Sequence, residues 1–230
     1  MLIDKYADKV PIPENGNISE VRSNLAVFVQ RINATKFKEI TATMQQQPKN
    51  KNKTFMENQF HVSENPNRNG AFLISITLPR SILNNTRFTP SRVSVVFFRN
   101  PTFLSPENEN ENNTFEIIAA ARFNGNHSYK NLQDPVVIKF NHGKVNHEMK
   151  PVCVFWETEA KEGFGDWSTE SCILQETKNG VSTCHCNHLT HFGLLLVCLP
   201  IFLFQIIGPL YYLNLEYSLK GTPIVKANCL

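Results

Sequence analysis

Cysteine, tryptophan and histidine crowd together between residues 151 and 196, and these are the side chains best suited to chemistry. Four of the six cysteines fall in this stretch, at Cys153, Cys172, Cys184 and Cys186. In an oxidising compartment they would form two disulfides, for which three pairings are possible. The alternative is a zinc site made of Cys172, Cys184, Cys186 and His188, but the paired Cys-x-x-Cys units typical of such sites are missing.

The tripeptide His188-Leu189-Thr190, directly after the cysteines, is a second candidate for chemistry. A threonine hydroxyl becomes a nucleophile when a nearby base takes its proton. In an extended strand, residues two apart face the same side, so the His188 imidazole can approach the Thr190 hydroxyl. Attack on the Leu189 carbonyl would turn the peptide into an ester that water cleaves. This rearrangement needs a strained bond, and the neighbouring disulfides and β-scaffold would supply the restraint.

The elements that must position these residues are predicted to be short β-strands. Side chains alternate from Phe72 to Leu78 and from Val93 to Phe97, and short apolar runs follow at 114–120 and 136–140. Prolines and Asn/Gly-rich turns separate these runs, a pattern typical of an all-β sandwich.

The first 70 residues show a different pattern. Residues 1–16 are polar with two prolines and are predicted to be a linker, and residues 44–70 are predicted to be a long polar loop. A capping box of Asn17 and Glu20 opens a stretch with apolar residues at helical spacing, which predicts a helix over 18–32. Those apolar residues are Val21, Leu25, Phe28 and Ile32.

Asn-x-Ser/Thr sequons indicate the secretory pathway. They all precede the cysteine cluster, at Asn17, Asn33, Asn52, Asn84, Asn112 and Asn126. A charge follows the third residue, so no signal-peptide core forms, and we expect a secreted-type segment that has lost its leader. A cytosolic Asn-rich protein is the alternative.

An uncharged apolar stretch from Leu194 to Leu213 is long enough to cross a bilayer, although two prolines and a glycine interrupt it. The lysines that follow, Lys220 and Lys226, would place the C-terminus in the cytoplasm. The competing interpretation is a buried final strand followed by an apolar tail.

Composition excludes several functions. The net charge is +3, from 23 basic and 20 acidic residues, without a basic stripe, so a nucleic-acid partner is not expected. The acidic run 107–111 lacks the glycine and spaced Asp ligands of a calcium loop. We therefore expect no cofactor and no metal.

Residues 153–196 resemble the proteolysis-site (GPS) motif of adhesion G protein-coupled receptors. The matching features are Cys-x-Phe-Trp, then Trp-Ser with a cysteine shortly after, then Cys-x-Cys-Asn-His-Leu-Thr and Phe-Gly-x-Leu-Leu. In that family the motif forms the last strands of the autoproteolysis-inducing (GAIN) domain, in which a helical subdomain precedes a β-sandwich. The resemblance implies that Cys153 pairs with Cys184, that Cys172 pairs with Cys186, and that the two tryptophans, Trp156 and Trp167, pack in the core.

The resemblance also implies the chemistry. His188 would be the base, Thr190 the nucleophile and Leu189–Thr190 the scissile bond. The strand from Thr190 to about Val197 would be a tethered agonist that stays buried after cleavage and activates the receptor's membrane helices on release. Its residues would be Thr190, Phe192, Leu194 and Leu195.

The expected fold is mainly β, a sandwich with a short N-terminal helical remnant and an apolar C-terminal tail. The predicted division is a linker and helical remnant at 1–50, a polar loop at 51–70, the sandwich at 71–196 with the motif at 151–196, and a tail at 197–230 that contacts a membrane through 197–213. The seven membrane helices of the family do not follow, so we expect a truncated receptor for which a G protein is a partner only in a full-length form.

The predicted function is the extracellular region of such a receptor, which cleaves itself once at Leu189–Thr190 and turns over no other substrate. The alternative is a non-cleaving extracellular adhesion or decoy module. Expected partners are an extracellular protein or matrix ligand and, after cleavage, the chain's own C-terminal strand. The expected location is the outer side of the plasma membrane, or secretion.

Overall fold

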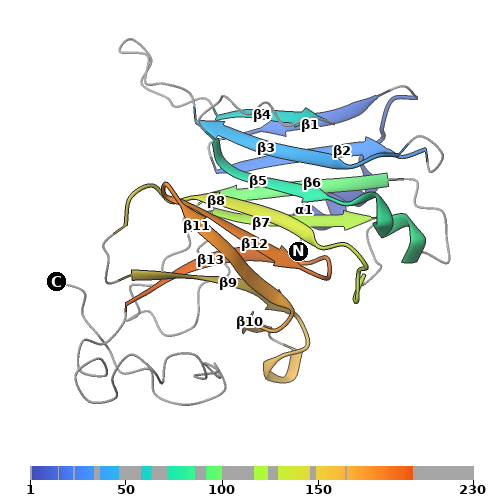
Figure 1. Ribbon diagram of the computed structural model, residues 1–230. Helices are drawn as coiled ribbons and strands as arrows, with labels where there is room; N and C mark the ends of the chain where they lie inside the picture. Colours follow the sequence, from blue (N-terminus) through green and yellow to red (C-terminus); the bar gives the residue numbers. More distant parts are fainter. Residues whose placement is uncertain are drawn as a thin grey trace, which may run out of the picture.

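The chain folds mainly into antiparallel β-strands, which Figure 1 shows as two stacked sheets. The computed structural model describes residues 2–14, 16–22, 24–33, 37–46, 58–63, 72–85, 92–99, 117–123, 129–145, 149–163 and 165–198. The helical elements are α1 (Leu2–Lys9), η1 (Arg80–Asn85) and η3 (Lys161–Gly163). The strands are β1 (Asn17–Val21), β2 (Leu25–Arg31), β3 (Ile40–Gln46), β4 (Asn58–Ser63), β5 (Phe72–Leu78), β6 (Arg92–Arg99), β7 (Ile117–Phe123), β8 (Val136–Asn141), β9 (Met149–Glu157), β10 (Asp166–Ser168), β11 (Cys172–Lys178), β12 (Val181–Cys186) and β13 (His191–Cys198).

The strands divide between a seven-stranded and a six-stranded sheet. The first runs in the order β1-β2-β6-β7-β13-β9-β10, and the second in the order β11-β12-β8-β5-β3-β4. The chain crosses between the sheets at the C-terminal end, because β12 belongs to the second sheet and β13 to the first. The loop between these two strands is therefore the connection that carries His188 and Thr190.

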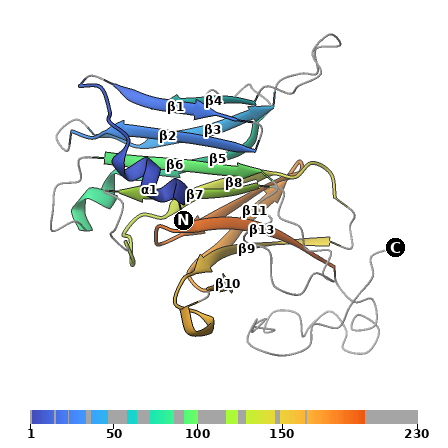
Figure 2. The same ribbon diagram turned by 180° about the vertical axis from the view of Figure 1, so that it is seen from behind.

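Apolar residues are buried on both faces of the seven-stranded sheet. The main core lies between the sheets, and side chains such as Ala26, Phe97 and Phe192 enter it. A second cluster on the outer face contains Val27 and Val29 with Ala7 of α1. Figure 2 shows α1 lying over this face, where it contacts β2 and β6. The helix thus covers apolar surface that would otherwise face water.

The mainly β fold with one short N-terminal helix agrees with the expected fold class, but the helix is not where the sequence placed it. The predicted helix over 18–32 is wrong, because this stretch forms β1 and β2, which pair with each other. The predicted linker over 1–16 is also wrong in part, because residues Leu2–Lys9 form α1. β1 to β4 all belong to the two sheets, although they lie before the predicted start of the sandwich at residue 71.

No helix in the described part of the chain is long and apolar enough to cross a membrane. The apolar stretch proposed for membrane contact, 197–213, lies outside the described residues from position 199 onward.

Candidate functional site

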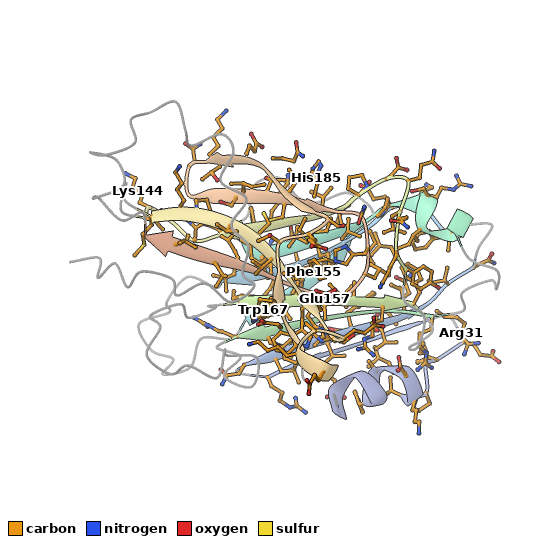
Figure 3. All side chains as sticks on the ribbon, turned by 90° about the horizontal axis from the view of Figure 1, so that it is seen from below. Arg31, Lys144, Phe155, Glu157, Trp167 and His185 are labelled. Atoms are coloured by element: carbon orange, nitrogen blue, oxygen red, sulfur yellow. A yellow bond between two sulfur atoms is a disulfide. The ribbon has the colours of Figure 1, made fainter. Side chains whose placement is uncertain are left out.

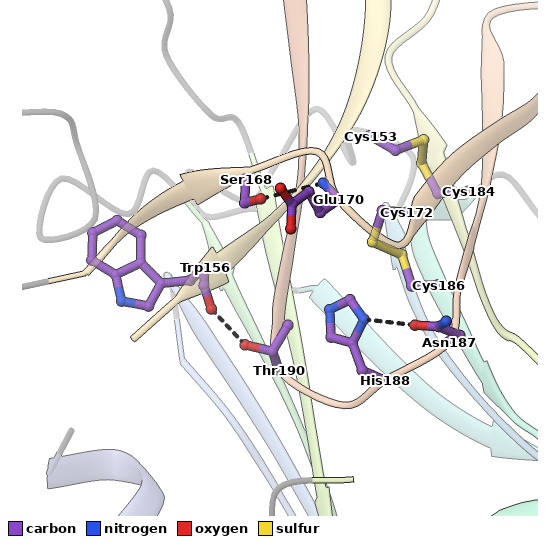
Figure 4. Close-up of a disulfide and its surroundings, with 10 residues drawn as sticks. All are labelled: Cys153, Trp156, Ser168, Glu170, Cys172, Cys184, Cys186, Asn187, His188 and Thr190. Atoms are coloured by element: carbon purple, nitrogen blue, oxygen red, sulfur yellow. Dashed lines mark hydrogen bonds between the residues drawn. A yellow bond between two sulfur atoms is a disulfide. The ribbon is translucent and has the colours of Figure 1, made fainter. Parts of the chain in front are cut away.

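Two disulfides fix the strand that precedes the candidate bond. Cys153 of β9 bonds Cys184 of β12 with the Cα atoms 5.9 Å apart, so this bridge joins the two sheets. Cys172 bonds Cys186 across the β11–β12 ladder with the Cα atoms 4.2 Å apart (Figure 4). These are the pairings that the family resemblance implied. The alternative zinc site is overturned, since its three cysteine sulfurs are bonded to other sulfurs and are not thiolates.

The candidate bond lies in a short loop and not in a strand. β12 ends at Cys186 and β13 begins at His191, so strand alternation does not bring His188 and Thr190 together, as the sequence argument had assumed. Backbone hydrogen bonds hold this loop on both sides of the bond. Leu189 N donates to Tyr129 O at 3.0 Å, and Ala121 N donates to Thr190 O at 3.3 Å.

The imidazole of His188 is buried among aromatic rings, with 7% of the residue exposed. The ring centroid of Phe155 lies 4.2 Å away in an edge-on arrangement, and that of Phe192 lies 5.7 Å away. Burial, and after it the nearby positive charge of Lys130, lower the pKa of His188 from 6.5 to about 4. The ring is therefore neutral at physiological pH.

The hydrogen bonds of His188 define which nitrogen is the base. Its Nδ1 lies 3.3 Å from the Asn187 side-chain oxygen, which can only accept, so Nδ1 carries the proton. Within the described residues, Nε2 is buried and has no hydrogen-bond partner. The lone pair of Nε2 is therefore available to take a proton.

The hydroxyl of Thr190 has a different partner. Its Oγ1 donates to the backbone oxygen of Trp156 at 2.8 Å. Figure 4 shows the Thr190 and His188 side chains rising from the same side of the loop, with the Thr190 hydroxyl turned toward Trp156 and away from the imidazole. Nucleophile and base are therefore neighbours on one loop without a mutual hydrogen bond.

The strand after the bond is deeply buried. β13 pairs with β9 from Phe192 to Cys198 and with β7 at His191 and Phe192. Phe192 and Leu194 point into the core between the sheets, and Leu195 packs on the outer face. Three of the four residues proposed for the agonist strand thus contact apolar clusters, and the fourth, Thr190, lies in the loop.

The tryptophans of the motif pack against each other at the end of β9. The Trp156 and Trp167 rings meet edge to face with centroids 5.4 Å apart. Figure 3 shows Phe155, Glu157 and Trp167 close together where β9 pairs with β10. A Cβ at Gly165 would lie 2.5 Å from the Trp156 ring, and its φ of +85° also favours glycine, so this glycine lets the ring close over the turn.

A cleft of about 430 Å³ opens beside the candidate bond and is lined by Leu189, Thr190 and His188. Sequence reasoning missed two contributors to this site. The 129–132 segment bonds the loop through the Tyr129 and Leu132 backbones, and Phe155 packs on the base. The first contact joins residues far apart in the chain, and no local pattern signals it. Phe155 lies within the motif, but its position against His188 follows only from the pairing of β9 with β13.

Of the six sequon asparagines, Asn17 and Asn33 are exposed, and Asn84 lies in η1. Asn52, Asn112 and Asn126 lie outside the described residues.

Comparisons with known proteins identify the family of the chain. Residues 28–198 match the family described as GPS: GAIN subdomain B. The chain is 35% identical over 129 residues to the adhesion G-protein coupled receptor G6 of Danio rerio, covering 54% of this chain and 11% of that protein. It is 32% identical over 185 residues to the adhesion G-protein coupled receptor G2 of Rattus norvegicus, covering 78% of this chain and 17% of that protein. The chain thus spans less than a fifth of the length of these relatives.

A solved structure shows the same fold. The full extracellular region of zebrafish Gpr126/Adgrg6 superposes with a TM-score of 0.67 at 26% identity, covering 81% of this chain and 24% of that one.

The fold and site define a class of disulfide-bridged β-sandwich domains, in which a bridged strand precedes a His-Leu-Thr loop and a buried strand follows it. The chain belongs to the GPS family and is a GAIN subdomain B. Its relatives indicate that this subdomain is of the kind found in the extracellular region of adhesion G-protein coupled receptors.

Proposed function

We propose that this subdomain cleaves its own Leu189–Thr190 bond once, with Thr190 as the nucleophile and His188 as the base. The observation that carries this proposal is a neutral, buried imidazole whose Nε2 has no partner among the described residues, two positions before a hydroxyl on the same loop. A neutral base with a free lone pair is what activation of a threonine hydroxyl needs.

The reaction balances without a cofactor. The Thr190 oxygen attacks the Leu189 carbonyl carbon while Nε2 of His188 takes the hydroxyl proton. The tetrahedral adduct collapses, the carbon–nitrogen bond breaks, and the proton passes to the leaving amine of Thr190. The resulting ester joins the Leu189 carbonyl to the Thr190 oxygen, and water hydrolyses it to a Leu189 carboxylate and a free Thr190 hydroxyl.

One rearrangement must precede attack. The Thr190 hydroxyl donates to the Trp156 oxygen, so it must leave this acceptor and turn toward Nε2 of His188. The loop has fixed points on both sides of the bond, at Leu189 N and Thr190 O, which limits the motion to the few atoms that react. Preorganisation of this kind supplies part of the rate of enzymatic reactions.

After cleavage, β13 stays in place as the proposed agonist strand. It is a central strand of the seven-stranded sheet, with Phe192 and Leu194 buried between the sheets. In a receptor that continues into the membrane, release of this strand would expose it to the membrane helices. We place the subdomain on the outer side of the plasma membrane or in the secreted fraction, with an extracellular protein or matrix ligand as its partner.

The second candidate function is a non-cleaving extracellular adhesion or decoy module. The hydrogen bond from Thr190 to Trp156 favours this candidate, because it engages the nucleophile away from its base. Such a module needs only the sandwich and its two disulfides.

Mass analysis under denaturing conditions separates the two functions. The chain is secreted behind an added signal peptide, and its glycans are removed before analysis. We expect two fragments that meet at Leu189 and Thr190, and a single intact chain for Thr190→Ala with an unchanged circular dichroism spectrum. Thr158→Ala removes a hydroxyl from the same cleft and should leave cleavage intact. An intact wild-type chain would contradict self-cleavage and support the adhesion module.

A further inference from the structure

Charged side chains line the cleft beside the candidate bond, and both signs are present. The charged residues are Arg122, Lys130, Glu157, Glu159 and Glu170. The cleft also contains the buried His188, whose Nε2 has no hydrogen-bond partner among the described residues.

The segment that carries Lys130 borders the residue before the bond. Leu189 N donates to Tyr129 O at 3.0 Å, and Leu132 N donates to Asn187 O at 2.7 Å. These two hydrogen bonds hold the 129–132 segment against residues 187–189, which become the C-terminal end of the N-terminal fragment after cleavage. Lys130 lies between them and is close enough to His188 to act on its charge.

An acidic residue borders the residue after the bond. β13 and β9 pair in one register, with Phe192 opposite Phe155 and Gly193 opposite Val154. The loop residue Thr190 donates its hydroxyl to the Trp156 oxygen at 2.8 Å, and Glu157 is the next residue of β9 and lines the same cleft. Within the described residues, the exposed Glu157 carboxylate has no ion pair.

We propose that this cleft receives the two termini that cleavage creates, with Lys130 binding the Leu189 carboxylate and Glu157 binding the Thr190 ammonium group. The inference rests on the proposed self-cleavage. An intact peptide bond is neutral, whereas hydrolysis leaves one negative and one positive charge at the same place. Lys130 attracts the new Leu189 carboxylate, and Glu157 attracts the new Thr190 ammonium group. Because Glu157 and Thr190 belong to different fragments, their contact joins the two fragments.

The test measures how fast the C-terminal fragment leaves. The secreted, cleaved chain is immobilised by an N-terminal tag in mild detergent and subdenaturing urea, and the released C-terminal fragment is quantified by mass. Because exposed ion pairs contribute little, we expect Glu157→Gln to speed release by about two- to fivefold. Lys130 and Leu189 both belong to the N-terminal fragment, so Lys130→Met should have the smaller effect on release of the C-terminal fragment.

Matched variants locate the effect. Glu159→Gln removes a carboxylate from the same cleft, and Glu176→Gln removes one from the exposed strand β11. Both should release the fragment at the wild-type rate. In the uncleaved Thr190→Ala chain, Glu157→Gln should leave the urea midpoint unchanged, because no ammonium group exists there.

The pH dependence gives a readout that a structural role of Glu157 would not produce. The groups around the new amine are Arg122 of β7, Lys130, Glu157, Glu159, Glu170, His188 and His191. Between pH 7 and 9.5 an α-amine loses its proton, with an ordinary pKa near 8. Pairing with Glu157 raises the pKa of the amine, so the contact persists below pH 8 and is lost as the pH rises through that raised value. Wild-type release should therefore accelerate across this window, and release from Glu157→Gln should not.

The outcomes are distinct. An intact wild-type chain overturns the proposed function and this inference with it. A cleaved chain in which Glu157→Gln releases its fragment at the wild-type rate, or in which Glu159→Gln has the larger effect, overturns the Glu157 assignment alone.

Discussion

The strands on either side of the Leu189–Thr190 bond are held in the sandwich by different forces. β12, before the bond, carries Cys184 and Cys186, and disulfides tie it to β9 and β11. β13, after the bond, is held by its ladders to β9 and β7 and by buried apolar side chains such as Phe192. Disulfides thus tie the chain before the bond to its neighbours, whereas the described part of the strand after the bond is held only by non-covalent contacts, namely backbone ladders and packing. A cut between them leaves a strand that can depart as one unit.

The largest expected effect comes from the packing side of this comparison. Phe192→Ala removes a fully buried ring from the core and should lower the free energy of unfolding by about 3–5 kcal/mol. Leu195→Ala, on the outer face where the side chain is only partly buried, should cost less. Urea unfolding in the Thr190→Ala background, where the chain is uncut, measures both. Equal losses would mean that the inner face of β13 is not its main anchor.

The covalent side is tested by removing each disulfide separately. In the chain-entropy account, the Cys153–Cys184 bridge, with a sequence separation of 31, contributes about 4 kcal/mol, and the Cys172–Cys186 bridge, with a separation of 14, contributes about 3 kcal/mol. The double variant Cys153→Ala/Cys184→Ala should therefore unfold at lower urea than Cys172→Ala/Cys186→Ala. Ile173→Thr is the control, since Ile173 is 62% exposed and should change stability by about 0.5 kcal/mol or less. If Cys172→Ala/Cys186→Ala instead unfolded at the lower urea concentration, the bridge between the two sheets would not be the more stabilising of the two.

A smaller effect is expected in the loop between the two strands, and it depends on pH. The pKa of His188 is about 4 in the folded chain and near 6.5 when unfolded. Above pH 6.5 both states are neutral. As the pH falls from 6.5 to about 4, the unfolded state binds a proton that the folded state does not, so stability falls by up to about 1.4 kcal/mol per pH unit.

The measurement compares Thr190→Ala with Thr190→Ala/His188→Asn by urea unfolding between pH 4 and 7.5. The variant that lacks His188 should show the shallower pH dependence over this window. Parallel curves would indicate that the buried imidazole is protonated in the folded state as readily as in the unfolded one.

Much of the fold follows from the sequence because the strands leave short apolar runs bounded by turn residues. The alternation from Phe72 to Leu78 and from Val93 to Phe97 lies in β5 and β6, and the runs at 114–120 and 136–140 overlap β7 and β8. The cysteine motif likewise has a local signature, and its disulfides are those that the resemblance implied.

The predicted helix over 18–32 is wrong for a physical reason. β2 is buried on both faces, with Ala26 in the core between the sheets and Val27 and Val29 under α1. A strand buried on both faces loses the period of two, and its apolar residues can then match a helical spacing by chance. The capping residues at Asn17 and Glu20 lie in β1 instead.

The site was predicted in its residue types but not in its geometry. His188 and Thr190 share a loop, and the contacts that define them come from Phe155, Trp156 and the 129–132 segment. These partners are set by strand pairing over long sequence separations, which a single sequence does not specify.

β13 is an interior strand of the seven-stranded sheet, so its departure would change the sheet that remains. β13 lies between β7 and β9, so its loss splits the seven-stranded sheet into a four-stranded piece, β1-β2-β6-β7, and a two-stranded piece, β9-β10. Two rows of unpaired backbone groups would then face each other across an empty slot, and such edges recruit any extended segment that fits. Besides the backbone, the Cys153–Cys184 bridge would tie β9 to β12, so this bridge would help the vacated slot to keep its shape for a returning strand.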